Sequence, residues 1–157
     1  MILALLLALQ TTPIAPIERG TGLPPPGTEE GAVMAPIAAA FAAFETGDGA
    51  ALLRHVYPEG RVTAVGATAN GTSGVRKQSF AEYAAKMTPG SGFQERVSSP
   101  AIEIDGDIAM VWAPFTVRRG GAVVSCGYDL FDLVREQGAW KIMNVTFSTR
   151  TGGCPAG

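Results

Sequence analysis

The sequence predicts one α+β domain, in which helices come first and a meander of antiparallel strands follows. Apolar residues recur every three or four positions from Val33 to Phe44, the spacing of a helix that buries one face. From residue 93 onward the apolar residues alternate, and Asp105-Gly106, Gly120-Gly121 and Gln137-Gly138 interrupt the alternation as tight turns. Segregated helices and strands are typical of an α+β fold, with the helices covering one face of the sheet.

The first two helices have recognisable ends. We expect the first helix to begin near Met34 with Pro36 in its first turn, or to bend at Pro36, because proline fits poorly inside a helix. Gly47 ends this helix, since glycine readily takes the left-handed conformation of a helix end. Asp48 is the expected N-cap of a second short helix within GAALLRHV, residues 49–56.

A hairpin and a third helix precede the meander. Asn70-Gly71, between RVTAVGA and TSGVRKQ, is a strong hairpin signal. Ser79 and Glu82 form a capping-box pattern that opens a helix through Met87, and Pro89-Gly90 close it. Four long antiparallel strands are expected after that, in FQERVSSPAIEID, DIAMVWAPFTVRR, AVVSCGYDLFDLVRE and AWKIMNVTFSTR.

Composition excludes several classes of function. The chain has 157 residues, a formal net charge of −2 and a pI of about 5.4, so no dense basic patch is available for nucleic acid or an anionic membrane. One histidine and two cysteines outside any CxxC pattern do not form a metal cluster. No glycine-rich phosphate loop or nucleophile elbow is present. We therefore expect no metal and no cofactor.

The N-terminal segment predicts export. MILALLLALQ is apolar, too short to span a bilayer, and of the length of a signal-peptide core, although no Lys or Arg precedes it and no clean cleavage site follows. We expect residues 1–16 to be a signal peptide, residues 17–30 a tether rich in proline and glycine, and residues 31–154 the folded domain. The mature protein would be periplasmic or secreted, with no membrane segment.

The two cysteines fit that compartment. Cys126 and Cys154 could pair in an oxidising environment, and closing a loop of about 28 residues would stabilise the fold by roughly 3–4 kcal/mol on the chain-entropy model. The alternative is two free thiols.

The order helix, short helix, hairpin, helix, meander resembles the NTF2-like (nuclear transport factor 2) superfamily. SFAEY, ERVSSPAIEIDGDIAMVWAPF and CGYDLFDLVREQGAWKI are similar to its SnoaL-like and lumazine-binding-like branch, and the likeness covers roughly Gly31 to Cys154. The resemblance implies a cone: a curved antiparallel sheet wrapped around about three helices, with an internal pocket. Many members carry a histidine just before the Cys-Gly pair, and this chain has Ser125 there, which disfavours histidine-based acid–base chemistry.

The turn at Gln137-Gly138 predicts which side chains face that pocket. A two-residue turn pairs Glu136 with Ala139, which places Leu133 opposite Ile142 and Phe131 opposite Asn144. Cys126 then lies on the other face. The face expected to line the pocket holds Ser125, Gly127, Asp129, Phe131, Leu133, Trp140, Ile142, Asn144 and Thr146.

Asp129 is the one carboxylate on that predicted inner face. Burial would raise its pKa and suit it to act as a general base next to a carbonyl. The alternative is a structural acid bonded to a backbone amide or a helix end. Glu59, Glu95 and Glu103 are interpreted as surface charges.

The expected ligand-binding side chains surround Asp129. Aromatic residues form the walls, two polar residues orient the ligand, Tyr57 overhangs the pocket mouth, and His55 lies near a helix end, where simple capping is the plainer interpretation. Besides Asp129, the predicted site holds Trp112, Phe131, Trp140, Asn144, Thr146, Tyr57 and His55.

Three functions are compatible with this pattern. The favoured hypothesis is a binding module for a small apolar or aromatic molecule. The second is an isomerase or cyclase, of the SnoaL or ketosteroid-isomerase type, that uses Asp129 as base. The third is a non-catalytic assembly domain that forms a homodimer through its sheet face. The fold alone does not choose between them, because the superfamily hosts all three.

Overall fold

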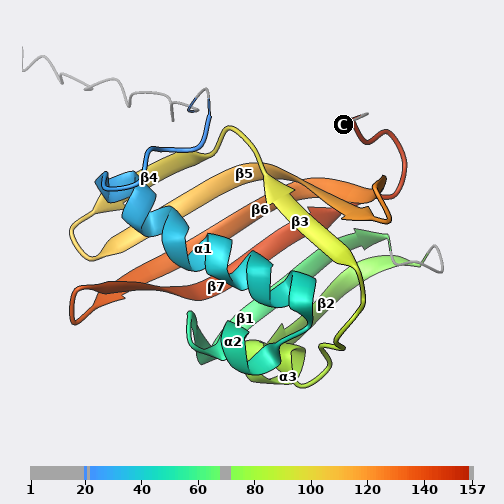
Figure 1. Ribbon diagram of the computed structural model, residues 1–157, viewed down its shortest axis with the longest axis horizontal. Helices are drawn as coiled ribbons and strands as arrows, with labels where there is room; N and C mark the ends of the chain where they lie inside the picture. Colours follow the sequence, from blue (N-terminus) through green and yellow to red (C-terminus); the bar gives the residue numbers. More distant parts are fainter. Residues whose placement is uncertain (1–19, 21, 68–71, 156–157) are drawn as a thin grey trace, which may run out of the picture.

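The computed structural model describes residues 20, 22–67 and 72–155, and this part of the chain forms two layers, three helices on one face of a seven-stranded sheet (Figure 1). The predicted α+β class is confirmed. The predicted signal peptide and the Asn70-Gly71 turn lie outside the described residues. The elements are α1 (Glu29–Thr46), α2 (Gly49–Leu53), β1 (Val56–Ala67), β2 (Ser73–Ser79), α3 (Phe80–Ala84), β3 (Phe93–Val97), β4 (Ala101–Asp105), β5 (Ile108–Arg119), β6 (Ala122–Glu136) and β7 (Ala139–Thr149).

Helix α1 begins earlier than expected. Thr28 is its N-cap and accepts a hydrogen bond from the Gly31 N–H, so the prediction of a start near Met34 is wrong. A hydroxyl that accepts a hydrogen bond from a first-turn N–H satisfies a donor that would otherwise lack a partner. Pro36 lies inside the helix and is buried. The helix thus starts within the segment predicted as tether, and none of the described helices is long and apolar enough to cross a membrane.

The other helix ends follow the sequence. Gly47 takes the left-handed conformation, with φ of 71°, and Asp48 caps α2 by accepting from the Ala51 N–H. The capping box of α3 is present in full: the Ser79 side chain accepts from the Glu82 N–H, and the Glu82 side chain accepts from the Ser79 N–H. These short helices hold the ends of α1 and β1 in place at one end of the sheet (Figure 1).

The sheet is mixed rather than purely antiparallel. Its order is β2-β1-β7-β6-β5-β3, with β4 also paired to β5, and β1 runs parallel to β7. The expectation of an all-antiparallel sheet is therefore wrong at that one pair. FQERVSSPAIEID forms two strands, because the chain turns at Ser99, where φ is 43°, just before Pro100. Proline has no N–H to continue a ladder.

The hairpin of β6 and β7 follows the predicted register only in part. Glu136 pairs with Ala139 and Leu133 with Ile142, as expected. Met143 is then an extra residue on β7, so Phe131 lies opposite Val145 instead of Asn144. Such a β-bulge reverses the faces of all later residues on its strand.

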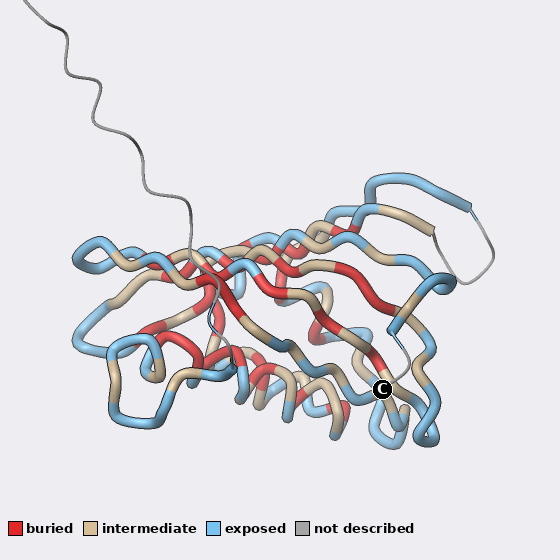
Figure 2. Tube along the Cα trace, turned by 90° about the horizontal axis from the view of Figure 1, so that it is seen from above, coloured by how far each residue is buried: buried red, intermediate tan, exposed pale blue. Residues whose placement is uncertain are grey.

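The core fills the space between α1 and the sheet, where the buried segments concentrate in Figure 2. Val33 and Ile37 of α1 are fully buried, and Leu133 and Ile142 of the sheet are 1% exposed. Because α1 lies across several strands, its apolar side holds the middle of the sheet together.

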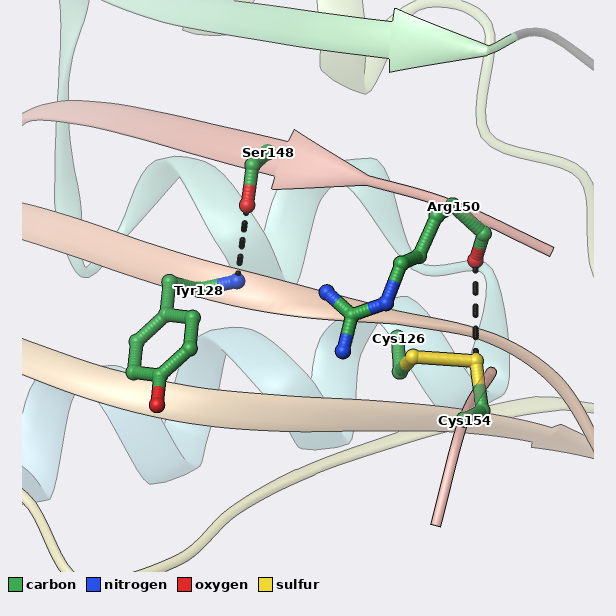
Figure 3. The surroundings of a disulfide bond; sticks show 5 residues. All are labelled: Cys126, Tyr128, Ser148, Arg150 and Cys154. Carbon is green, nitrogen blue, oxygen red and sulfur yellow. Dashed lines mark hydrogen bonds between the residues drawn. A yellow bond between two sulfur atoms is a disulfide. The ribbon is translucent and has the colours of Figure 1, made fainter. Parts of the chain in front are cut away.

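On the other face, the C-terminal segment is fixed to β6 (Figure 3). Cys126 and Cys154 form a disulfide with their Cα atoms 5.7 Å apart. Cys126 and Arg150 also exchange two backbone hydrogen bonds of 3.0 Å, and the Tyr128 N–H donates to the Ser148 hydroxyl at 3.0 Å. The predicted pairing of the two cysteines thus has the geometry it requires.

Candidate functional site

A cavity of about 160 Å³ lies between the sheet, the C-terminal half of α1 and helix α3. Its wall is mainly apolar, and seven of the lining residues are aromatic. An apolar cavity of about 150 Å³ is enough to hold a benzene molecule. The aromatic side chains that line it are Phe41, Phe44, Phe80, Tyr83, Phe115, Phe131 and Phe147.

Asp129 on β6 is the buried acid of this cavity. Its side chain is 2% exposed, and its Oδ2 atom has no hydrogen-bond partner. Burial raises the pKa of Asp129 well above its usual range, and the nearby charge of Glu95 raises it further. The placement expected from the sequence is therefore correct. The alternative was a structural carboxyl held by a backbone amide or a helix end, and no such hydrogen bond is made at Oδ2.

Glu95 on β3 lines the same cavity, so its interpretation as a surface charge is wrong. The register explains its position: Glu95 lies opposite Val117 on β5, and Val117 lies opposite Ser125 on β6, the strand that carries Asp129. Burial raises the pKa of Glu95 to about 7. The alternation of Phe93, Glu95 and Val97 was the signal that could have found it, because two apolar neighbours mark that side of β3 as the inner one.

Three hydroxyl groups accompany the two acids, those of Tyr83, Ser125 and Thr149. Burial raises the pKa of Tyr83, and the charges of Glu95 and Asp129 add to the shift. The cavity thus combines an apolar body with hydroxyl donors and a pair of carboxyls. Since two nearby carboxylates repel each other, the pair retains a proton at pH values where an ordinary carboxyl has lost it.

Two of the predicted aromatic residues lie on the inner side of the sheet. Phe131 lines the cavity, in edge contact with Phe41 at 6.1 Å between ring centroids. Trp140 is 8% exposed and belongs to the core, but it lies near the hairpin turn under the Arg135 guanidinium, 4.9 Å from the ring centroid. Trp140 therefore does not line this cavity.

Trp112, Asn144 and Thr146 lie on the opposite face of the sheet, and their placement in the pocket was wrong. Trp112 is 36% exposed and stacks on Tyr128 at 5.0 Å, because Val111 and Ala113 are the residues of β5 that point inward. Asn144 accepts from the Arg61 N–H at 3.0 Å, and Thr146 is exposed. The bulge at Met143 is the physical reason for the positions of Asn144 and Thr146, since it turns Val145 and Phe147 inward.

His55 and Tyr57 also lie away from the cavity. The Tyr57 hydroxyl donates to Glu136 at 3.3 Å, and the Lys141 ammonium lies 5.7 Å from its ring centroid. His55 accepts a backbone hydrogen bond from the Ile142 N–H at 3.0 Å. Neither side chain lines the cavity, so the expectation that they bind ligand there is not met.

The curved mixed sheet, its three helices and the cavity between them define an NTF2-like domain, as the sequence resemblance predicted. The chain belongs to the family described as "Putative lumazine-binding", whose model matches residues 28–148. No curated protein matches the chain in sequence.

Solved structures with the same fold are distant in sequence. A protein of unknown function with a cystatin-like fold from Nostoc punctiforme has a TM-score of 0.61 at 14% identity, covering 76% of this chain and 90% of its own. An NTF2-like protein of unknown function from Silicibacter pomeroyi has a TM-score of 0.55 at 20% identity, covering 76% and 93%. A "putative ketosteroid isomerase" from Shewanella frigidimarina has a TM-score of 0.56 at 21% identity, covering 74% and 94%. At these identities the likeness is one of fold.

Proposed function

We propose that the protein binds a small, mainly apolar, ring-containing molecule in the cavity, with the polar end of the molecule at Asp129 and Glu95. The observation that carries this proposal is the buried Asp129 Oδ2 atom, which lacks a hydrogen-bond partner and lines an aromatic cavity. An unsatisfied buried polar atom costs about 1–3 kcal/mol, and a ligand that bonds to it would recover part of this cost. The family description, with lumazine as a bicyclic heteroaromatic ligand, agrees with such a site.

The size of the cavity limits the ligand. About 160 Å³ suits one ring with a short substituent, or a second ring that extends into the opening. A molecule of four fused rings exceeds this space.

A thermal-shift and calorimetric panel of one- and two-ring compounds, including lumazine, tests the proposal. Ala40 of α1 is buried and lines the cavity, so Ala40→Leu should fill part of it and weaken binding at least about tenfold. Ala42→Leu is the matched control, because Ala42 is exposed on the other side of the same helix. Equal binding by both variants, or no binding by the wild type, would refute the proposal.

A second candidate function is proton transfer next to a carbonyl, favoured by the pair of carboxyls beside the Tyr83 hydroxyl. One ionised carboxylate would remove a proton from the carbon between a carbonyl and a C=C bond. The resulting dienolate oxygen would accept hydrogen bonds from the protonated carboxyl and from Tyr83, and the proton would return to the γ-carbon. The Shewanella frigidimarina structure carries a name for such an activity.

Conversion of 3-cyclohexenone to 2-cyclohexenone, followed by the ultraviolet absorbance of the conjugated product, tests this activity on a ring that fits. Asp129→Asn should abolish turnover while the melting temperature stays unchanged or rises. Turnover that persists in Asp129→Asn and in Glu95→Gln would show that the pair is not the base.

We also propose that the protein is exported, with residues 1–16 as signal peptide and 17–27 as the segment before the domain, whose first helix has Thr28 as its N-cap. The cysteine pair at disulfide geometry supports this, since disulfides persist in oxidising compartments. Cell fractionation and the intact mass of the mature protein test it, and an unprocessed protein in the cytoplasm would contradict it.

The homodimer through the sheet face stays a prediction. The Trp112–Tyr128 stack lies on that outer face and offers apolar surface for it. Sedimentation that shows only monomer at micromolar concentration would dispose of it.

A further inference from the structure

We propose that the ligand of the cavity is a small organic cation: a molecule with a ring-sized apolar body and a basic nitrogen, which Glu95 and Asp129 hold as an ammonium group. This inference rests on the proposed function and names the chemical class of its ligand.

The first argument is the charge inside the cavity. Two carboxyl groups line it, and none of the described residues that line it is a lysine, an arginine or a histidine. The guanidinium of the neighbouring Arg96 bonds to Glu45 at 2.9 Å instead. A pair of acids without a cation favours a positively charged guest and disfavours an anion.

The second argument is the free hydrogen-bonding capacity. Asp129 is only 2% exposed, and its Oδ2 atom has no hydrogen-bond partner. This acceptor is therefore already desolvated before a ligand arrives. An ammonium group has several N–H donors on one small centre. It can therefore donate to Asp129 and to Glu95 at once, which a ligand with a single hydroxyl cannot do.

The third argument is the aromatic wall. Six phenylalanines and Tyr83 line the cavity, and the faces of aromatic rings attract cations. Such rings solvate a buried ammonium better than an aliphatic wall would. The same rings also accept the apolar body of the ligand, so one surface serves both ends of the molecule.

Cation binding should release a proton. The titratable groups of the cavity are Glu95 from β3, Asp129 from β6 and Tyr83 from α3, whereas the lining residues of α1, α2, β1, β5 and β7 bring none. A bound ammonium favours the ionised form of both carboxyls, and burial otherwise holds a proton on them. Affinity should therefore rise with pH as Glu95 ionises.

Isothermal titration calorimetry with benzylamine, benzyl alcohol and benzoate tests the inference, because the three probes share a ring and differ in charge. At pH 7.5 benzylamine should bind at least about tenfold more tightly than benzyl alcohol, and benzoate should not bind. The affinity for benzylamine should increase about threefold or more from pH 6 to pH 8, a range in which benzylamine stays protonated.

Glu95→Gln should bring benzylamine and benzyl alcohol to within about twofold of each other and weaken the pH dependence, to which Asp129 then contributes alone. Glu103→Gln is the matched control, since Glu103 lies exposed on β4 outside the cavity. Benzyl alcohol binding as tightly as benzylamine in the wild type would overturn the inference and leave the small-molecule proposal in place. Failure of all three probes to bind, together with a silent ring-compound panel, would overturn both.

Discussion

The buried pair of carboxyls predicts that the protein loses stability as pH rises through neutrality. The folded protein keeps a proton on Glu95 up to a pKa of about 7, whereas the unfolded chain loses it near 4.5. Between these values the folded state binds more protons than the unfolded state, so the free energy of unfolding falls with increasing pH. Asp129, whose pKa burial also raises, acts in the same direction.

The magnitude follows from the Glu95 values. A shift from 4.5 to about 7 corresponds to a loss of about 2–3 kcal/mol between pH 5 and pH 8 for this group alone. For a domain of this size the loss lowers the melting temperature by about 10 °C. The pKa of Glu82 is lowered by its bond to the Ser79 N–H, so its stabilising effect disappears only below about pH 4.5, outside this range.

Thermal and urea unfolding followed by circular dichroism at pH 5, 6, 7 and 8 would measure the slope. Glu95→Gln should reduce the slope of stability against pH, and adding Asp129→Asn should reduce this slope further. The exposed control Glu103→Gln should leave the slope unchanged. A wild type that gains stability from pH 5 to pH 8, or a Glu95→Gln variant with the full slope, would refute the reasoning that these acids share a buried cavity.

Three further predictions concern the frame that holds the site. Ser79→Ala removes half of the α3 capping box and should cost about 1 kcal/mol in urea unfolding, whereas Ser73→Ala, at the other end of β2, should cost little. Replacing Cys126 and Cys154 by alanine opens a 28-residue loop and should cost about 3–4 kcal/mol; an unchanged midpoint would show that the bond does not constrain the unfolded chain. Gly127→Ala places a Cβ against the Ser148 carbonyl oxygen and should cost about 3 kcal/mol, whereas Gly74→Ala, with open space around it, should be tolerated.

Local chemistry made much of the fold predictable from sequence. Gly47, Asp48 and the Ser79–Glu82 box act on neighbours within a few residues, so their effects appear directly in the sequence. The turn at Gln137-Gly138 likewise determined the register of β6 and β7 as far as Leu133 and Ile142. Asp129 and Phe131 could be placed inside because β6 keeps its alternation between the two.

The rest depended on information that the sequence does not state locally. The apolar residues of β7 change from even to odd positions, from Trp140 and Ile142 to Val145 and Phe147, and the bulge at Met143 causes this change. The prediction carried the register of the turn past this point and therefore placed Asn144 and Thr146 inward. Trp112 looked like a wall residue because of its size, whereas the alternation of β5 places small Ala113 inward. The local alternation of β3 could have placed Glu95 inward, but its proximity to Asp129, which lies 34 positions later in the chain, depends on the register of β3, β5 and β6.

The extra residue in β7 has a consequence for how relatives of this protein should be compared. A homologue with one residue fewer at Met143 would expose the equivalents of Asn144 and Thr146 to the interior and turn those of Val145 and Phe147 to solvent. Two nearly identical chains would then differ at two lining positions, which are apolar in one and polar in the other. The deletion of one residue would thus change two positions of the cavity wall at once, whereas one replacement changes a single position.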